Sequence, residues 1–183
     1  MAEEEESGPK YGFVTESGEV LTMSRGYTGK AVATYPQGDV YEGSYVDGIR
    51  DGRGCYRYVT GEKYDGQWVG NFRHGLGHMH YNGKGEYQGY WENGKRHGEG
   101  VFTYPSGDVY SGWFRFGKKE GTGTYYSKDG MKLTGEWKED KLERGQWELP
   151  NGTLYQGGFE GNKPTSEGMW VFQNGNEQRG KYD

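Results

Sequence analysis

The sequence of 183 residues has few aliphatic side chains, little net charge and a single cysteine. Leu, Ile, Val and Phe together supply only 24 residues, too few for an ordinary aliphatic core. The net charge of −5 is smaller than that of typical disordered chains, and its sign argues against nucleic acid as a partner. No apolar run approaches the roughly 20 residues of a membrane-spanning helix. Cys55 alone cannot form an internal disulfide, which fits a reducing, cytoplasmic compartment.

Glycine and aromatic residues are abundant instead, with 36 Gly, 17 Tyr, 7 Phe and 6 Trp. Tyr and Trp must therefore supply most of the buried area. These residues recur with a fixed period, because the tripeptide Tyr-x-Gly begins at Tyr41 and again 23 residues later at Tyr64, then at Tyr87 and Tyr110, and finally at Tyr155. A period of this length is typical of an array of structural repeats.

Each repeat has the pattern of two strands and two turns. An aromatic residue follows the anchoring Tyr by four positions, and Gly, Asn or Asp follows it by seven, where these residue types favour the left-handed backbone of a hairpin turn. Because Tyr41, Gly43 and Tyr45 share one face of a strand, we expect rings to lie over glycines of the adjacent strand. The sequence predicts an all-β fold, an elongated single-layer antiparallel meander of stacked β-hairpins that twist coils into a trough.

The phase of the repeat divides the chain into regular and degenerate units. Residues 1–10 are expected to form an acidic, disordered leader without the apolar segment of a secretory signal. Residues 11–40 are expected to form a degenerate cap with a half-repeat, residues 133–154 a degenerate repeat, and residues 178–183 a terminal half-repeat. The regular repeats are 41–63, 64–86, 87–109, 110–132 and 155–177.

The recurring aromatic residues are candidates for a partner-binding groove. Any one ring is more simply a core residue, but a single-layer sheet has no second layer to cover its apolar face. Some rings should then line an open groove suited to an amphipathic helix. The candidate groove residues are Tyr41, Tyr45, Tyr64, Trp68, Tyr87, Trp91, Tyr110, Phe114, Trp137, Tyr155 and Phe159.

Charged residues also recur in phase with the anchor. Stacked hairpins would place equivalent residues about 9.6 Å apart, or two strand spacings, along each edge of the sheet. Such rows would recruit an acidic partner or membrane surface on one edge and a basic partner on the other; the alternative is that charges at hairpin turns are merely solvated. The basic edge comprises Arg50, Arg73, Arg96 and Lys119, and the acidic edge Asp39, Glu62, Glu86 and Asp108.

No catalytic, cofactor or metal site is predicted. His78 and His80 share a face of a predicted strand, but two histidines without Cys, Asp or Glu in register do not make a metal site. Cys55 has no base or resolving thiol placed beside it. The Gly-rich segments do not precede helices, which excludes phosphate-binding loops. An open sheet also provides no pocket where a titratable pair could converge, so an enzyme is not expected.

The repeat unit Tyr-x-Gly-x-Trp-x-x-Gly-x-x-x-Gly-x-Gly, of which residues 87–100 are a close copy, resembles the MORN repeat. The resemblance covers residues 30–183 and implies an open sheet of successive hairpins. Proteins of this family differ in function, since some carry a kinase or methyltransferase domain and others are small scaffold proteins.

The C-terminal part has a narrower resemblance, carried by residues 155–159, 162–164, 168–172 and 175–182. It is similar to the MORN-repeat radial spoke head proteins of motile cilia. The resemblance implies a structural subunit of the ciliary or flagellar axoneme that packs against other radial spoke head or cytoskeletal proteins. The alternative is a membrane- or cytoskeleton-associated adaptor that binds a partner helix or anionic lipid through its trough, and a homodimer is a further option.

Overall fold

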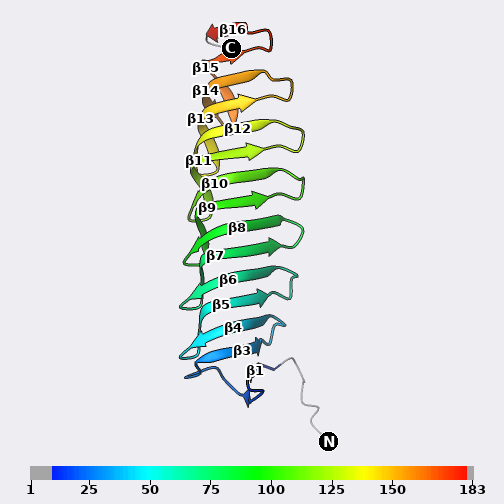
Figure 1. Ribbon diagram of the computed structural model, residues 1–183, viewed down its shortest axis with the longest axis vertical. Helices are drawn as coiled ribbons and strands as arrows, with labels where there is room; N and C mark the ends of the chain where they lie inside the picture. Colours follow the sequence, from blue (N-terminus) through cyan, green and yellow to red (C-terminus); the bar gives the residue numbers. More distant parts are fainter. Residues whose placement is uncertain (1–9, 181–183) are drawn as a thin grey trace, which may run out of the picture. The chain divides into compact units, whose positions relative to one another are not determined.

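The computed structural model describes residues 10–180, and all the regular secondary structure in that range consists of β-strands (Figure 1). Sixteen strands belong to one antiparallel sheet in which nearly all hydrogen-bonded neighbours are consecutive in the chain. This confirms the predicted all-β meander of hairpins. Among the described residues there is no helix that could cross a membrane. Most of the predicted leader (residues 1–9) and residues 181–183 of the terminal half-repeat lie outside the described residues.

The chain divides into two compact units. The described part of unit 1 consists of residues 10–82 and 91–94. Its strands are β1 (Gly12–Thr15), β2 (Val20–Leu21), β3 (Gly29–Thr34), β4 (Val40–Val46), β5 (Ile49–Arg57), β6 (Lys63–Val69) and β7 (Phe72–Tyr81). The order departs from the chain only at the start, where β1 pairs with both β2 and β3.

The described part of unit 2 consists of residues 83–90 and 95–180. It begins with β8 (Gly85–Glu92), whose last two residues belong to unit 1. The following strands are β9 (Lys95–Thr103), β10 (Val109–Arg115), β11 (Lys118–Tyr126), β12 (Lys132–Lys138), β13 (Lys141–Glu148), β14 (Leu154–Glu160), β15 (Lys163–Val171) and β16 (Glu177–Gly180).

The hairpins β4–β5, β6–β7, β10–β11, β12–β13 and β14–β15 close with two-residue turns in which both residues have positive φ. This backbone matches the right-handed twist of the flanking strands. The expected left-handed residue at position seven is present, for example Asn71 with φ 70°. The residue before it is also left-handed, which the sequence did not indicate for Phe116 (φ 50°) and Glu139 (φ 47°).

Glycines let the tyrosine rings lie directly against the strands. A Cβ atom at Gly43 would stand 2.5 Å from Gly54 Cα on the adjacent strand and 2.6 Å from Tyr41 Oη. The Tyr41 hydroxyl donates a hydrogen bond to the carbonyl of Ser44 at 3.1 Å, which holds the ring flat across its own strand. The expected packing of rings over glycines is therefore present, and a bulge after Gly43 bends the strand.

Candidate binding surface

All eleven aromatic residues predicted to line an open groove are buried. In unit 1, Tyr41 packs edge-to-face on Tyr45 and Trp68, with ring centroids 5.2 and 5.4 Å apart. In unit 2, Tyr110 packs in the same way on Phe114 and Trp137, at 5.2 and 5.3 Å. The groove prediction is therefore wrong, and the residues that belong to the core are Tyr41, Tyr45, Tyr64, Trp68, Tyr87, Trp91, Tyr110, Phe114, Trp137, Tyr155 and Phe159.

The rings cover one another without a second layer of secondary structure. Each ring contacts rings of its own repeat and of the next, and edge-to-face geometry is the favoured arrangement for such pairs. The polar edges are also used, because Trp68 Nε1 donates to the Gly54 carbonyl at 3.1 Å and Trp137 Nε1 to the Gly123 carbonyl at 3.0 Å. Because these rings are buried, a partner helix cannot contact them. They therefore do not form the expected helix-binding groove.

The basic residues expected at one edge cover the rings instead of facing solvent. In unit 1, the Arg50 guanidinium lies 4.7 Å from the centre of the Trp68 ring, and the Arg73 guanidinium lies 4.5 Å from that of Trp91. Arg73 Nη2 also donates to the Gly94 carbonyl at 2.8 Å. These contacts combine cation–π attraction with burial of the aliphatic stems.

Unit 2 repeats the arrangement with one arginine and one lysine. The Arg96 guanidinium lies 5.2 Å from the Phe114 ring centre and donates to the Gly117 carbonyl at 2.5 Å. Lys119 Nζ lies 4.5 Å from the Trp137 ring centre, and burial lowers the pKa of Lys119. The predicted basic edge of Arg50, Arg73, Arg96 and Lys119 is therefore wrong as a solvent-facing row, because all four side chains serve as lids on the core.

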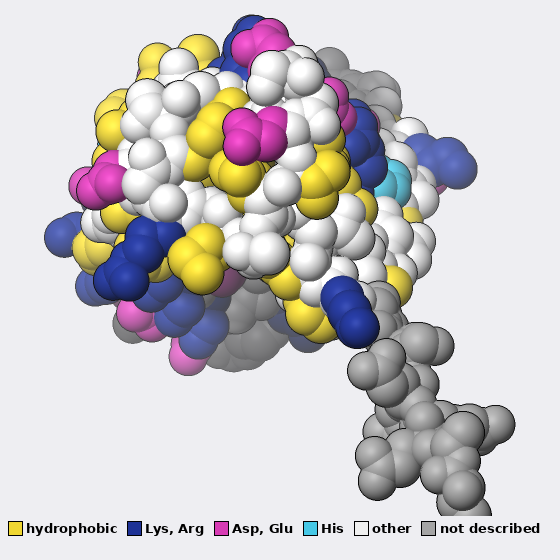
Figure 2. Space-filling view, turned by 90° about the horizontal axis from the view of Figure 1, so that it is seen from below, with side chains coloured by type: hydrophobic (Ala, Val, Ile, Leu, Met, Phe, Trp, Pro, Cys, Tyr) yellow, Lys and Arg dark blue, Asp and Glu magenta, His cyan; other side chains and the backbone are white. Residues whose placement is uncertain are grey.

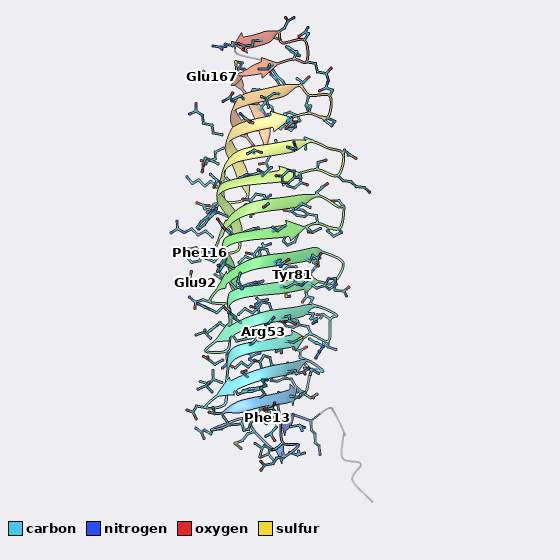
Figure 3. All side chains as sticks on the ribbon, viewed as in Figure 1. Phe13, Arg53, Tyr81, Glu92, Phe116 and Glu167 are labelled. Atoms are coloured by element: carbon cyan, nitrogen blue, oxygen red, sulfur yellow. The ribbon has the colours of Figure 1, made fainter. Side chains whose placement is uncertain are left out.

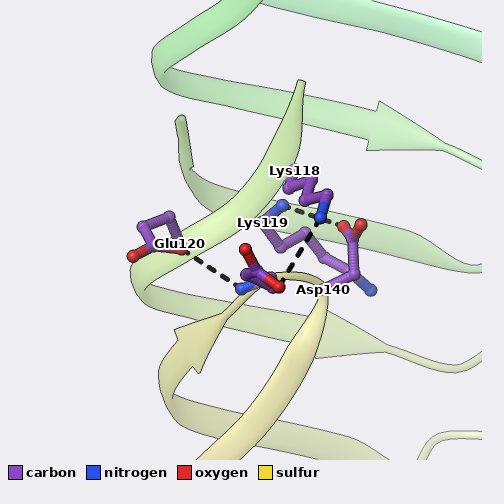
Figure 4. Close-up of polar contacts among 5 residues, drawn as sticks. Lys118, Lys119, Glu120 and Asp140 are labelled. Carbon is purple, nitrogen blue, oxygen red and sulfur yellow. Dashed lines mark hydrogen bonds and ion pairs between the residues drawn. The ribbon is translucent and has the colours of Figure 1, made fainter. Parts of the chain in front are cut away.

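Turn residues of one hairpin also bind the backbone of the preceding hairpin. In unit 1, Asn71 Oδ1 accepts a hydrogen bond from the Arg50 amide at 2.9 Å. In unit 2, Asp140 Oδ1 accepts one from the Lys119 amide at 2.9 Å, and the Glu139 amide donates to Glu120 at 3.1 Å (Figure 4). These contacts, which we call the turn ties, fix each of these turns to the preceding hairpin.

The acidic residues expected at the other edge do not act alike. Asp39 is buried and accepts hydrogen bonds from the Tyr56 hydroxyl and the Val59 amide, both at 2.8 Å. Asp108 accepts from the Tyr125 hydroxyl at 2.5 Å and the Lys128 amide at 2.8 Å. These hydrogen bonds, with that of Tyr125 the strongest, lower the pKa of Asp108.

Two of the four predicted acidic residues are thus turn caps and not docking charges. Glu62 is half-buried and accepts a 3.4 Å hydrogen bond from Thr60 Oγ1, and Glu86 is exposed. The predicted row of Asp39, Glu62, Glu86 and Asp108 is corrected accordingly. A carboxylate is placed two residues before the anchoring Tyr because it closes the second turn of the repeat.

The surface left for partners is the outer face, meaning the face of each unit opposite the buried rings. In unit 1 it holds a groove of about 610 Å³ whose lining includes Val32, Glu42, Arg53 and Cys55. Glu42 is ion-paired with Arg57 at 3.3 Å. Arg53, one of the residues that line this groove, is labelled in Figure 3. Seen from below, hydrophobic side chains lie among uncharged atoms and side chains of both charges (Figure 2).

The outer face of unit 2 has two features that the sequence analysis missed. Arg144, Gln156, Met169 and Arg179 are among the residues that line a cleft of about 620 Å³ near the C-terminus. An exposed apolar patch on β8–β10 consists of Tyr90, Val101 and Trp113. The alternation of strand residues could have indicated Tyr90 and Trp113, because each follows the anchoring Tyr by three positions and so faces away from it.

The described residues contain no group of three or more His, Cys, Asp or Glu that could hold a metal ion. One reason given against a metal site was wrong, because Asp65 lies opposite both His78 and Cys55 in the register of the sheet. Burial raises the pKa of the Cys55 thiol, which disfavours the reactive thiolate. The chemistry available on the outer face is that of a binding surface.

The fold and these surfaces define a β-hairpin repeat protein with an aromatic core and polar outer faces. The chain belongs to the MORN repeat family, whose model matches residues 41–63, 64–85, 87–109, 110–132 and 155–177. The matched model indicates a repeat family suited to a scaffold or binding role, and no enzyme family is indicated. No curated protein matches the chain.

Solved structures of low sequence identity resemble the fold. One is the TCP domain of SAS-4 (dCPAP) in complex with a proline-rich motif of Ana2 (dSTIL) from Drosophila melanogaster, with 14% identity, coverage of 84% of each chain and a TM-score of 0.51. Another is the TCP10c domain of Drosophila melanogaster Sas-4, with 15% identity over 84% of this chain and 93% of that chain and a TM-score of 0.40. The first likeness shows a related sheet architecture.

Proposed function

We propose that this chain is a non-enzymatic scaffold of the ciliary or flagellar axoneme, a radial spoke head subunit that packs against other spoke-head proteins. The observation that carries the proposal is the C-terminal sequence from Tyr155 onward, which resembles the MORN-repeat radial spoke head proteins. Its described part, residues 155–180, spans nearly all of β14 together with β15 and β16.

The outer-face cleft of unit 2 is the contact that we assign to this role. It lies on the same strands as the resemblance, and Gln156, Met169 and Arg179 line it. Arg144 and Arg179 are exposed, with Arg179 held by Glu177 at 3.0 Å. Glu143 and Glu167 also line the cleft, so a contact there would combine charges of both signs with the apolar Met169. The SAS-4 domain, solved with a motif of another protein, supports a protein partner.

The alternative of an adaptor for a helix or for anionic lipid receives less support. Its expected contacts were the aromatic row and the basic edge, which are buried or half-buried in the core. Each of these cations lies over two to four rings and gives up those contacts if it turns toward a lipid surface.

Affinity purification from ciliated cells tests the proposal. A tagged chain is recovered at about 0.15 M and about 0.5 M salt, which shortens the Debye length about twofold, and bound proteins are identified by mass spectrometry. We expect spoke-head proteins at both salt concentrations, and tagged protein along the axoneme by fluorescence microscopy.

A matched pair of variants locates the contact. Arg144→Glu combined with Arg179→Glu reverses the two cations of the cleft, whereas Lys10→Glu reverses one exposed charge elsewhere. We expect only the double variant to lose the spoke-head proteins. Recovery of motor or membrane proteins in their place, or an even distribution through the cell body, contradicts the axonemal assignment.

A further inference from the structure

The exposed patch on β8–β10 is unusual because two large aromatic side chains lie on the outer face, outside the buried core. Tyr90 and Trp113 each have 48% of their surface exposed, and Val101, on the strand between them, has 40%. A glycine on a neighbouring strand lies beside each of the two aromatic residues: a Cβ atom at Gly98 would stand 3.4 Å from Tyr90 Cβ, and one at Gly121 3.7 Å from Trp113 Cβ. No side chain at these two positions can therefore cover the rings.

The two rings occupy the same position in successive repeats, so two strand spacings of about 4.8 Å separate them, or about 9.6 Å. A polyproline II helix rises about 3.1 Å per residue with three residues per turn, so equivalent residues recur every 9.3 Å or so. A segment in this conformation that crosses the strands presents one residue to each ring. Glu99 lies opposite Trp113, on the strand between the two rings, and Val101, opposite Ser111 and diagonal to Trp113, lies beside the line of rings.

Carboxylates flank this line of rings. Glu99 lies opposite Trp113 in the register of β9 and β10, and Glu136 lies opposite Thr122, one residue beyond the glycine beneath Trp113. Within residues 10–180, neither carboxylate has a hydrogen-bond or ion-pair partner. Cations also border the patch, because Arg144 lies opposite Glu136 and Arg115 shares the outer face of β10 with Trp113, so the charge that complements a Lys or Arg of a bound segment is that of Glu99, opposite Trp113.

We propose that the outer face of β8–β10 binds a basic, proline-rich segment of a partner protein in the polyproline II conformation. Prolines three residues apart lie on Tyr90 and Trp113, and a Lys or Arg between them reaches Glu99. Aromatic residues are the common platform for this conformation, because the segment is already extended and loses little entropy on binding. An amphipathic helix needs a wider apolar stripe than three side chains flanked by carboxylates provide.

This inference is independent of the axonemal role, since it concerns a different surface from the C-terminal cleft. The test uses the full chain and a fluorescein-labelled synthetic peptide of about 12 residues, four polyproline II turns, with Pro at every third position and Arg between. A second peptide of identical composition has its four prolines at alternate positions, so that no two lie three residues apart while the charge stays the same. Fluorescence anisotropy measures both dissociation constants.

We expect the periodic peptide to bind at least about fivefold more tightly than the permuted one. Trp113→Ala should weaken binding about tenfold, the effect of a ring that contributes 1.4 kcal/mol or so. Tyr90→Ala should weaken it in the same direction, and Glu99→Lys should also weaken binding of the periodic peptide because it places a cation where the peptide's Arg is expected. Phe72→Ala removes an exposed ring on β7 and serves as the matched control that should bind as the parent chain does.

Two results overturn the proposal. Equal affinity for the periodic and permuted peptides means that charge alone drives binding. Unchanged affinity in Trp113→Ala, with Phe72→Ala also unchanged, places the peptide elsewhere on the chain. Because Trp113 is exposed, its replacement should leave the urea midpoint of unfolding unaltered. If the midpoint does shift, the Glu99→Lys variant tests the same site without removal of a ring, and unchanged peptide affinity in that variant overturns the proposal.

Discussion

Replacement of Gly43 by alanine should destabilise the protein far more than a single methyl group normally does. The new Cβ would stand 2.5 Å from Gly54 Cα, 2.6 Å from Tyr41 Oη and 2.7 Å from the Arg53 carbonyl oxygen. Two of these atoms are backbone of the adjacent strand, so the strands must separate or the Tyr41 ring must leave its place. Forced overpacking of this kind costs about 1–3 kcal/mol.

The Tyr41 hydroxyl adds to this cost, because displacement of the ring breaks its 3.1 Å hydrogen bond to Ser44. Such a bond contributes about 1 kcal/mol, so we expect a total loss of about 2–4 kcal/mol in the free energy of unfolding. With a urea dependence near the upper end of the usual range, about 2.5 kcal/mol per molar, the midpoint falls by about 1–1.5 M.

Gly12→Ala is the matched control for this experiment. Gly12 is also a strand residue of unit 1, but a Cβ there would meet only Thr34 Cβ, at 3.9 Å. That variant should be neutral or gain up to about 1 kcal/mol, because alanine restricts the unfolded chain. Urea unfolding followed by tryptophan fluorescence compares the three proteins. If the midpoints of Gly43→Ala and Gly12→Ala agree within error, the close approach of ring and strands does not support the fold as argued.

Three further predictions concern the turns and the buried phenols. Phe116→Asn should raise the thermal midpoint by a few degrees, because asparagine tolerates the positive φ that costs phenylalanine about 1 kcal/mol; an unchanged or lower midpoint contradicts this. Asn162→Gly keeps the turn but removes the acceptor of the 2.7 Å bond from the Leu142 amide, so hydrogen exchange at Leu142 should accelerate several-fold, and unaltered exchange would count against the turn tie. Burial raises the pKa of Tyr41 and Tyr110, whereas unfolded tyrosine ionises near about 10. Stability from these phenols is complete below that pH and declines as the pH rises through their raised native values, so the urea midpoint should fall from about pH 10 upward, and a constant midpoint to about pH 11 refutes this.

The regular part of the fold could be predicted because the period of the sequence reports it directly. A Tyr-x-Gly step and a Gly, Asn or Asp seven residues later specify a strand and a turn by local backbone preference. The left-handed backbone of Phe116 could not be predicted, since the paired strands on both sides impose it against the preference of the residue. The position of β1 between β2 and β3 also depends on pairing that no local pattern encodes.

The binding surface was harder to predict because the same residues are consistent with an exposed or a buried row. The sequence places Arg50 and Trp68 at fixed offsets, but only the bend of the hairpin brings the guanidinium over the ring. The sequence therefore indicated a solvent-facing row of cations, although these side chains are half-buried. Conversely, the period did not indicate a role for Tyr90 and Trp113, because the residue three positions after the anchoring Tyr varies between repeats.

The turn ties have a consequence for how such a chain can change over evolutionary time. The Asn71 side chain contacts the hairpin that precedes it in unit 1, and the Asp140 side chain does the same in unit 2. Duplication or deletion of one complete repeat therefore leaves every remaining repeat with the contacts it already had. Unequal recombination could lengthen or shorten the array without any compensating substitution, whereas an insertion of one residue inside a strand would be felt at once.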